Sequence, residues 1–241
     1  MRTTIVIPTY NEAVNIGELV RRIRVAVPEV HIVVVDDNSP DGTGKLVQDI
    51  AQSDGQVSLF ARPGKEGLGL AYVAGFKKVL TDSSITHVVM MDSDLSHDPA
   101  VLPAMLKAAE SFELVVGSRY VKGGGTVGWE LWRRALSFWG NFYARVVAGL
   151  PIHDCTGGFN CINANNLRSL DLGSINATGY AFIMGLKFRL IKNGASVTEV
   201  PIVFRNRTGG ESKMSSKVIA RYFNEGILAP WKMRFKRVTR A

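Results

Sequence analysis

Short apolar runs alternate with amphipathic segments through the first half of the chain, and this order constrains the fold more than any other feature. The run at 31–35 is almost continuously apolar, as is typical of a strand buried on both faces of a sheet. Before it, Ile16, Leu19, Val20 and Ile23 recur at helical spacing. We predict strands at 3–8, 31–35, 57–61, 88–91 and 114–117, with helices at 12–27, 43–52, 69–81 and 99–111 between them. Such an order indicates an α/β fold with a mainly parallel central sheet and helices on both faces.

The second half of the chain shows no pattern of a second core. Glycines at 123–125 predict a flexible loop, followed by a helix at 129–147, a strand at 197–204 and a helix at 216–227. The 241 residues suit one or two domains, and we interpret 1–241 as a single domain. Within it, 1–120 carries the alternating pattern, 121–225 adds to that sheet, and 226–241 forms a basic amphipathic tail.

Composition and charge restrict the class of protein. Hydrophobic residues make up 46% and charged residues 21%, which excludes a disordered chain, a collagen and a disulfide scaffold. No run of 18 apolar residues and no signal-peptide pattern occurs, so we expect a cytoplasmic protein without a membrane span. Residues 1–120 hold 11 basic and 15 acidic side chains, whereas 121–241 hold 18 and 6. This asymmetry indicates an anionic partner for the second half, or else a solvated basic face.

Acidic side chains follow three of the predicted strands. Glu12 comes after the first strand, Asp36 and Asp37 end the second, and Asp92 and Asp94 follow the fourth. The carboxyl ends of parallel strands meet at one edge of a sheet, where ligands bind. Clustered carboxylates repel one another unless a cation neutralises them, and a hard divalent cation prefers oxygen ligands. The sequence therefore predicts a metal site at this edge, with turn capping as the alternative role of these aspartates.

Five motifs in a fixed order carry a resemblance to a known family. They are PTYNE at 8–12, VDDNSPDGT at 35–43, DSD at 92–94, GSRY at 117–120 and GESK at 210–213. Together they resemble inverting family 2 glycosyltransferases of the GT-A (Rossmann-like) fold, and in particular the catalytic domain of dolichol-phosphate (polyprenol-phosphate) mannose synthases. The resemblance runs from about residue 3 to about residue 222. The DSD triplet alone is a weak signal, whereas the ordered set is specific.

The resemblance implies a nucleotide-sugar-binding half at 1–120 and an acceptor-side half at 121–225. In the first half it implies that a base and ribose are bound by Pro8, Tyr10, Glu12, Val35 and Asp37. It also implies that the donor diphosphate and its Mg²⁺ or Mn²⁺ are held by Asp92, Ser93 and Asp94, with Ser96 as a further metal ligand.

Cationic positions follow from the same resemblance. Arg119, Arg207 and Lys213 match positions around the donor and acceptor phosphates and join Asp94 as candidate catalytic residues. Arg133 and Asp154 match positions on the acceptor side. The two glycines between Arg207 and Lys213 predict a mobile loop able to close over a bound phosphate.

The implied reaction is transfer of mannose from GDP-mannose to a polyprenyl or dolichyl phosphate, with inversion. The same chemistry with UDP-glucose or another sugar nucleotide is the first alternative. A non-catalytic module that binds an anionic membrane or nucleic acid is the second, although strand-end carboxylates would repel phosphates unless a metal is bound. An ionised lipid phosphate needs no strong base, in keeping with four histidines that form no motif. Only His97, after the acidic motif, is a candidate for contact with the metal shell.

Contact with a membrane is suggested by two segments of the second half. The predicted helix at 129–147 aligns Trp129, Trp132, Leu136, Trp139 and Tyr143 on one stripe. This stripe either packs on the sheet or, with its flanking arginines, lies at a membrane interface. The tail at 231–237 alternates apolar and basic residues, as surface-seeking segments do. The resemblance accordingly implies a peripheral protein at the cytoplasmic face of a membrane, with a possible small membrane-protein partner and no nucleic acid.

Overall fold

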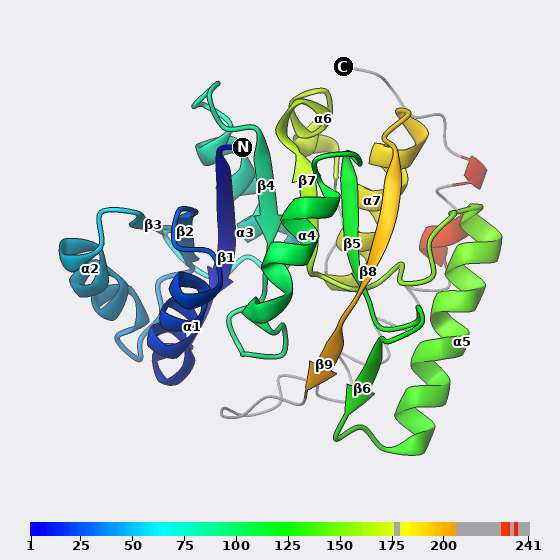
Figure 1. The fold of residues 1–241 in the computed structure, drawn as a ribbon, viewed down its shortest axis with the longest axis horizontal. Helices are drawn as coiled ribbons and strands as arrows, with labels where there is room; N and C mark the ends of the chain where they lie inside the picture. Colours follow the sequence, from blue (N-terminus) through cyan, green and yellow to red (C-terminus); the bar gives the residue numbers. More distant parts are fainter. Residues whose placement is uncertain (176–178, 206–227, 232–233, 236–241) are drawn as a thin grey trace.

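A computed structural model describes residues 1–175, 179–205, 228–231 and 234–235 of the chain. Its centre is a seven-stranded sheet in the order β3-β2-β1-β4-β7-β5-β8 (Figure 1). All neighbouring strands are parallel except β7, which runs antiparallel to both β4 and β5. The strands of this sheet are β1 (Thr3–Thr9), β2 (His31–Asp36), β3 (Val57–Ala61), β4 (His87–Met90), β5 (Leu114–Ser118), β7 (Asn160–Asn163) and β8 (Val197–Pro201).

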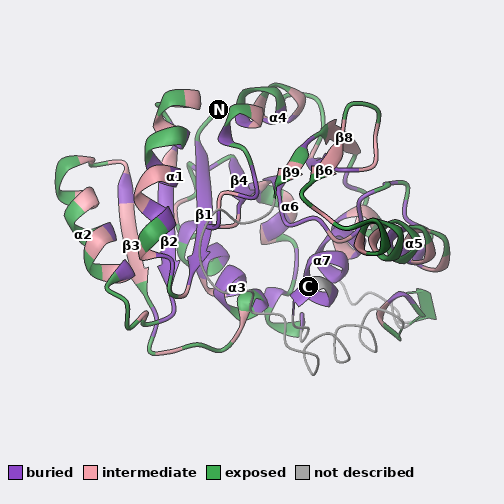
Figure 2. Cartoon of the chain, turned by 90° about the horizontal axis from the view of Figure 1, so that it is seen from below, coloured by how far each residue is buried: buried purple, intermediate pink, exposed green. Residues whose placement is uncertain are grey.

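Helices cover both faces of the sheet, as the sequence predicts (Figure 2). On β1, Ile5 and Ile7 enter one buried core while Val6, between them, enters the other, because side chains alternate along a strand. The first core includes α1 (Ala13–Ala26), α2 (Thr43–Ser53) and α4 (Leu102–Ala108). The second includes α3 (Leu68–Val79), α6 (Ala164–Arg168), α7 (Gly179–Lys192) and the inner side of α5 (Leu131–Ala148).

Two predicted elements differ from the structure. The segment predicted as one helix at 99–111 begins with the 3₁₀ turn η1 (Pro99–Val101) and continues as the short α4. The strand predicted at 197–204 is two strands, because β8 ends at Pro201, opposite Ser118, the last residue of β5. After it, β9 (Val203–Arg205) leaves the large sheet and pairs in parallel with β6 (Gly125–Val127).

The predicted loop at 123–125 is a tight turn. A side chain at Gly124 would come within 2.5 Å of the carbonyl oxygen of Ser118, so only glycine fits there. A second 3₁₀ turn, η2 (Leu172–Ser174), precedes α7. No described helix combines the length and the hydropathy needed to cross a bilayer. The helix predicted at 216–227 lies outside the described residues.

Candidate active site

The acidic strand ends meet at one edge of the sheet. Thr9 at the end of β1 is in register with Asp36 at the end of β2, and β4 pairs with β1 on its other side. In the loops that follow these three strands stand Asn11, Asn38 and Leu95, with φ angles of 59°, 56° and 62°. A left-handed conformation at a leucine costs roughly 1–3 kcal/mol, and such strain gathers at functional sites. The backbone is therefore bent at each acidic strand end.

The two aspartates that end β2 have different surroundings. Asp36 closes a turn, since its oxygens accept hydrogen bonds from the Thr9 hydroxyl (2.7 Å) and the Ser39 amide (2.9 Å). Asp37 forms a buried ion pair with Arg62. Burial raises the pKa of Asp37, although the charge of Arg62 acts in the opposite direction. Contact of Asp37 with a base, which the resemblance implies, stays a prediction.

Three other predicted nucleotide-binding residues, Pro8, Tyr10 and Glu12, lie at the end of β1 or just after it, beside the end of β2. The Tyr10 ring carries the Lys65 ammonium 4.1 Å from its centroid. Glu12 is buried and accepts a hydrogen bond from the Asn15 side chain at 3.0 Å. Pro8 is a buried residue of β1.

Val35 differs from the other predicted base contacts, because its side chain is fully buried. A methyl group placed on Gly75 of α3 would come 2.9 Å from Val35 Cγ2, which shows how closely the helix covers this side chain. Any contact of Val35 with a base is therefore left to its backbone atoms.

The DSD motif follows β4, and its first carboxylate is held from two sides. The Tyr72 hydroxyl, on α3, donates to Asp92 Oδ1 at 3.3 Å. Burial, followed by the charge of Asp92, holds the pKa of Tyr72 well above its ordinary value, so the hydroxyl stays a donor. His97 Nδ1 accepts the Asp92 amide at 3.1 Å, which leaves Nε2, 3.8 Å from Asp92 Oδ2, to carry the ring proton. His97 thus lies beside the motif, as its sequence position suggested.

The second carboxylate of the motif is more deeply placed. Asp94 and Ser93 are buried, and Asp94 Oδ1 accepts the Ser96 amide at 3.1 Å. The Ser96 hydroxyl is buried and has no hydrogen-bond partner among the described residues. A methyl group at Gly158 would come 3.5 Å from Asp92 Oδ1, so the glycine keeps room in front of that carboxylate.

These oxygens fit a divalent cation of the expected kind. The described residues contain no group of three or more His, Cys, Asp or Glu that could hold a metal by themselves. Two carboxylates and one buried, unpartnered hydroxyl at Ser96 instead suit Mg²⁺ or Mn²⁺ that takes further oxygens from water and a diphosphate.

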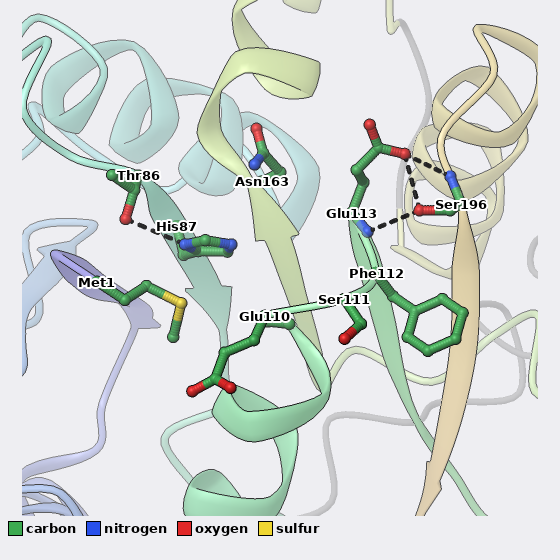
Figure 3. Close-up of a pocket in the computed structure, with 10 residues that line it drawn as sticks. Met1, Thr86, His87, Glu110, Ser111, Phe112, Glu113, Asn163 and Ser196 are labelled. Carbon is green, nitrogen blue, oxygen red and sulfur yellow. Dashed lines mark hydrogen bonds between the residues drawn. The ribbon is translucent and has the colours of Figure 1, made fainter.

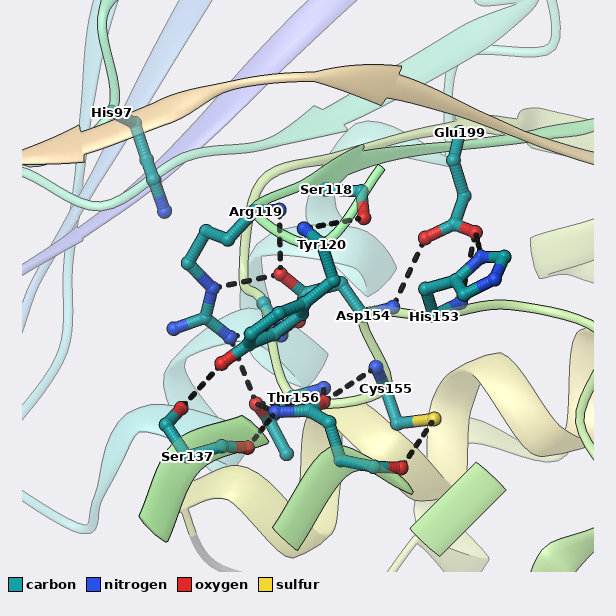
Figure 4. A network of polar contacts seen from close by, with 12 residues as sticks. His97, Ser118, Arg119, Tyr120, Ser137, His153, Asp154, Cys155, Thr156 and Glu199 are labelled. Atoms are coloured by element: carbon teal, nitrogen blue, oxygen red, sulfur yellow. Dashed lines mark hydrogen bonds and ion pairs between the residues drawn. The ribbon is translucent and has the colours of Figure 1, made fainter. Parts of the chain in front are cut away.

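Arg119 follows β5 and is the best-anchored cation of the site (Figure 4). Its Nε and one terminal nitrogen each donate to Asp154 at 2.7 Å, and the same nitrogen donates to the Thr156 hydroxyl at 2.9 Å. Asp154 also accepts the Gly157 amide at 2.8 Å and is fully buried. Burial alone would raise the pKa of Asp154, but Arg119 and Lys187 outweigh it and lower the pKa to about 2.

This arrangement alters the expected role of Asp154. Its carboxylate lies beneath Arg119 and has no exposed surface, so in this structure it does not face an acceptor. What it does is fix the direction of the Arg119 guanidinium.

An aromatic cluster joins Arg119 to the neighbouring candidates. The Trp129 ring lies 5.7 Å from the Arg119 guanidinium carbon and 4.2 Å from that of Arg133, so it is near both cations. Its indole nitrogen is buried and unpartnered within the described part of the chain. Phe204 contacts Arg119 at 5.7 Å and His97 at 5.6 Å. Phe204 therefore joins Arg119 to His97, which lies beside Asp92 of the acidic motif.

Some predicted site residues lie outside the described part of the chain, and the sequence reasoning missed others. Arg207 and Lys213, and with them the predicted loop that closes over phosphate, lie outside the described residues. The sequence reasoning missed Arg62, Tyr72 and Lys187. Arg62 follows directly after the predicted strand at 57–61, so the strand-end rule that identified the aspartates would have found it.

A shallow cavity of about 610 Å³ lies at the opposite edge of the sheet (Figure 3). It is lined by residues at the amino ends of β4, β5 and β8, among them His87, Glu113 and Ser196. Glu113 accepts hydrogen bonds from the Ser196 amide and hydroxyl, which ties β5 to β8. This cavity contains none of the strand-end carboxylates and is separate from the candidate active site.

Comparison with known proteins agrees with this geometry. Residues 4–170 match the family model described as glycosyl transferase family 2. The chain belongs to glycosyltransferase family 2. A relative from Micrococcus luteus named undecaprenyl-phosphate mannosyltransferase is 42% identical, over 91% of this chain and 90% of its own length. A relative from Mycolicibacterium smegmatis named polyprenol monophosphomannose synthase is 44% identical, over 90% of this chain and 83% of its own length.

More distant relatives of this glycosyltransferase extend the comparison. A dolichol-phosphate mannosyltransferase from Pyrococcus furiosus is 34% identical and covers 100% of this chain and 67% of its own length. Among solved structures, a glucosyl-3-phosphoglycerate synthase from Mycobacterium tuberculosis, in complex with Mn²⁺ and UDP, has a TM-score of 0.67 at 18% identity. That match covers 97% of this chain and 79% of the other. The fold of this glycosyltransferase is GT-A, as the motifs predict.

Proposed function

We propose that this glycosyltransferase moves mannose from GDP-mannose to a polyprenyl or dolichyl phosphate, with inversion at the sugar. The observation that carries the proposal is identity of 42% and 44%, over about nine tenths of the chain, to relatives named for mannosyl transfer to undecaprenyl phosphate or for polyprenol monophosphomannose synthesis. The site supports it, because Phe204 contacts both Arg119 and His97, and His97 Nε2 lies 3.8 Å from Asp92 of the acidic motif. A donor diphosphate and an acceptor phosphate need these two kinds of group.

Each part of the site has a separate task in this reaction. Asp92 and Asp94 would hold Mg²⁺ or Mn²⁺, which supplies positive charge to the departing diphosphate. Asp37 would accept hydrogen bonds from the base, with Arg62 holding its carboxylate in place. Arg119 would bind a phosphate oxygen through the part of its guanidinium that Asp154 does not face.

The acceptor oxygen needs no separate general base in this scheme. A phosphate monoester is ionised at neutral pH, so its oxygen is already a nucleophile. The contribution of the chain is then to hold the two phosphates in line and to supply positive charge where charge develops. Arg119 and Arg133, both near the Trp129 ring, would serve that purpose.

A lipid acceptor also accounts for the outer side of α5. Trp132, Leu136 and Trp139 are 65%, 50% and 62% exposed, so the prediction that this stripe packs on the sheet is wrong for these residues. We name the exposed apolar residues of the helix the α5 face; it consists of Leu131, Trp132, Leu136, Phe138, Trp139, Phe142 and Val146. The charged residues within α5 are three arginines, and no acidic residue lies between its ends.

The end of the chain continues this surface. Arg234 donates to the Val147 carbonyl oxygen at 3.2 Å, which places it against the last turns of α5. Trp231 and Phe235 stack at 5.6 Å and are 50% and 71% exposed. Aromatic rings flanked by basic side chains are typical of segments that lie in a membrane interface. We therefore place the enzyme peripherally at the cytoplasmic face of a membrane; the small membrane-protein partner stays a prediction.

A panel of labelled nucleotide sugars, offered with one polyprenyl phosphate, tests the donor and the reaction together. We expect label in the lipid fraction only from GDP-mannose, and loss of transfer when a chelator is added. Transfer from UDP-glucose instead would favour the alternative donor. No transfer and no donor hydrolysis from any sugar nucleotide would contradict the proposed reaction.

A further inference from the structure

Asn141 joins the inner side of α5 to the loop that carries Asp154. Its side chain is 3% exposed, and both ends of the amide are used. Oδ1 accepts the amides of Cys155 at 2.9 Å and Thr156 at 3.2 Å. Nδ2 donates to the Ser137 carbonyl oxygen at 2.8 Å and to the Thr156 hydroxyl at 3.2 Å. One buried side chain therefore binds a helix to two consecutive residues of a loop.

The same loop residues hold Arg119. The Thr156 hydroxyl that Asn141 contacts also accepts from the Arg119 guanidinium at 2.9 Å. Asp154, two residues earlier, makes the paired hydrogen bonds to Arg119. Asn141 thus contacts Thr156, which accepts from Arg119, and Cys155, which adjoins Asp154.

A second contact runs parallel to the first (Figure 4). The hydroxyls of Tyr120 and Ser137 lie 2.6 Å apart, which ties the residue after Arg119 to α5 one helical turn before Asn141. The two neighbours of Arg119, Tyr120 and Thr156, are therefore both tied to the inner side of α5, and the α5 face lies on the opposite side of that helix.

We propose that Asn141 is a positioning residue for Arg119. It fixes the loop at 154–157 to α5, so that the guanidinium keeps a constant place relative to the helix that presents the α5 face. The residue type follows from the contacts, because a primary amide of this length supplies an acceptor for two backbone amides and donors for two oxygens. Its effect on catalysis rests on the proposed function; its effect on the order of Arg119 does not.

The kinetic test compares Asn141→Ala with Thr156→Val and with the double variant. Each single change should lower kcat/KM for polyprenyl phosphate about tenfold, the order expected from lost hydrogen bonds in a buried network. Because both changes act on the same contacts to Arg119, the double variant should be no worse than Asn141→Ala alone. Losses that multiply in the double variant, or unchanged kcat/KM in Asn141→Ala, would overturn the proposal.

A control and a second readout separate positioning from general loosening of α5. Ala135→Gly weakens the same helix at an exposed position and should leave acceptor kcat/KM within about twofold of the wild type. In NMR spectra, solvent exchange of the Arg119 Nε–H should be slow in the wild type and at least tenfold faster in Asn141→Ala. Unchanged exchange in that variant would overturn the proposal, even if the wild-type enzyme proved to use a different acceptor.

Discussion

Replacing Asp154 by asparagine should destabilise the enzyme by an amount that the structure allows to be worked out in two ways. The pKa of the carboxyl falls from 3.8 to about 2 on folding. At about 1.4 kcal/mol per pKa unit, the ionised form contributes roughly 2–3 kcal/mol. Independently, removing one partner of a buried ion pair typically costs about 3–5 kcal/mol. Asparagine keeps one acceptor oxygen, so we expect a loss of about 3 kcal/mol at pH 7.

The contribution of Asp154 to the free energy of unfolding should decrease as the pH falls. The folded pKa of Asp154 lies below the unfolded one, so its stabilisation is complete above about pH 4 and disappears as the pH falls towards 2. The wild type should therefore lose more stability than Asp154→Asn across that window. Arg119, whose Nε and terminal nitrogen donate to this carboxylate, should also lose its fixed direction in the variant.

Urea unfolding at pH 7, and again at several pH values between 5 and 2.5, measures both quantities. Asp82→Asn is the matched control, because Asp82 pairs with Arg2 at the surface and its loss should leave the midpoint close to that of the wild type. An unchanged urea midpoint for Asp154→Asn at pH 7 would refute the reasoning. So would parallel pH profiles for this variant and the wild type.

Four further changes test the remaining parts of the account. Asp94→Asn should leave the fold intact but raise the Mg²⁺ or Mn²⁺ concentration for half-maximal activity at least about tenfold, since even outer-shell losses cost that much; unchanged metal activation would contradict the metal assignment. Asp37→Ala should weaken GDP binding by about 1–3 kcal/mol in calorimetry, and an unchanged Kd would place the base elsewhere. Burial lowers the pKa of Lys187 to about 8, so between pH 8 and 10.5 the unfolded state binds a proton that the folded state has lost. The free energy of unfolding of the wild type should therefore rise over this range relative to that of Lys187→Met, and equal pH dependence of the two would refute this. The double variant Trp132→Ser, Trp139→Ser should sediment less with anionic vesicles than the wild type. Equal sedimentation of the two proteins would contradict the role of the α5 face.

The strand-end residues were predictable because their position depends on topology alone. A parallel sheet brings the ends of β1, β2, β4 and β5 to one edge whatever the side chains are. For that reason Asp37, Asp94 and Arg119 stand at the edge where the sequence pattern put them. The core of the first half followed from the same reasoning, since Ile16 and its helical neighbours are buried as their spacing indicates.

Other features depend on packing that no local pattern records. The spacing of apolar residues in α5 shows which of them share a face but not what that face contacts. Both tryptophans of this helix are in fact exposed. Tyr72 lies within a predicted helix, where nothing marks it as a partner of Asp92. Lys187 reads as a solvated lysine in sequence, yet it is buried and donates to the Asp154 carbonyl oxygen at 2.8 Å. The Asn141 contacts arise only when α5 and the loop at 154–157 come together.

The most direct test of the central claim is transfer of radiolabelled mannose from GDP-mannose to undecaprenyl phosphate by the purified chain, followed by assignment of the anomeric configuration of the product. The account predicts label in the lipid fraction, dependence on a divalent cation, and a β-linked mannosyl phosphate formed from the α-linked donor. Retention of the α configuration, or label that stays with water-soluble products while another nucleotide sugar labels the lipid, would contradict it.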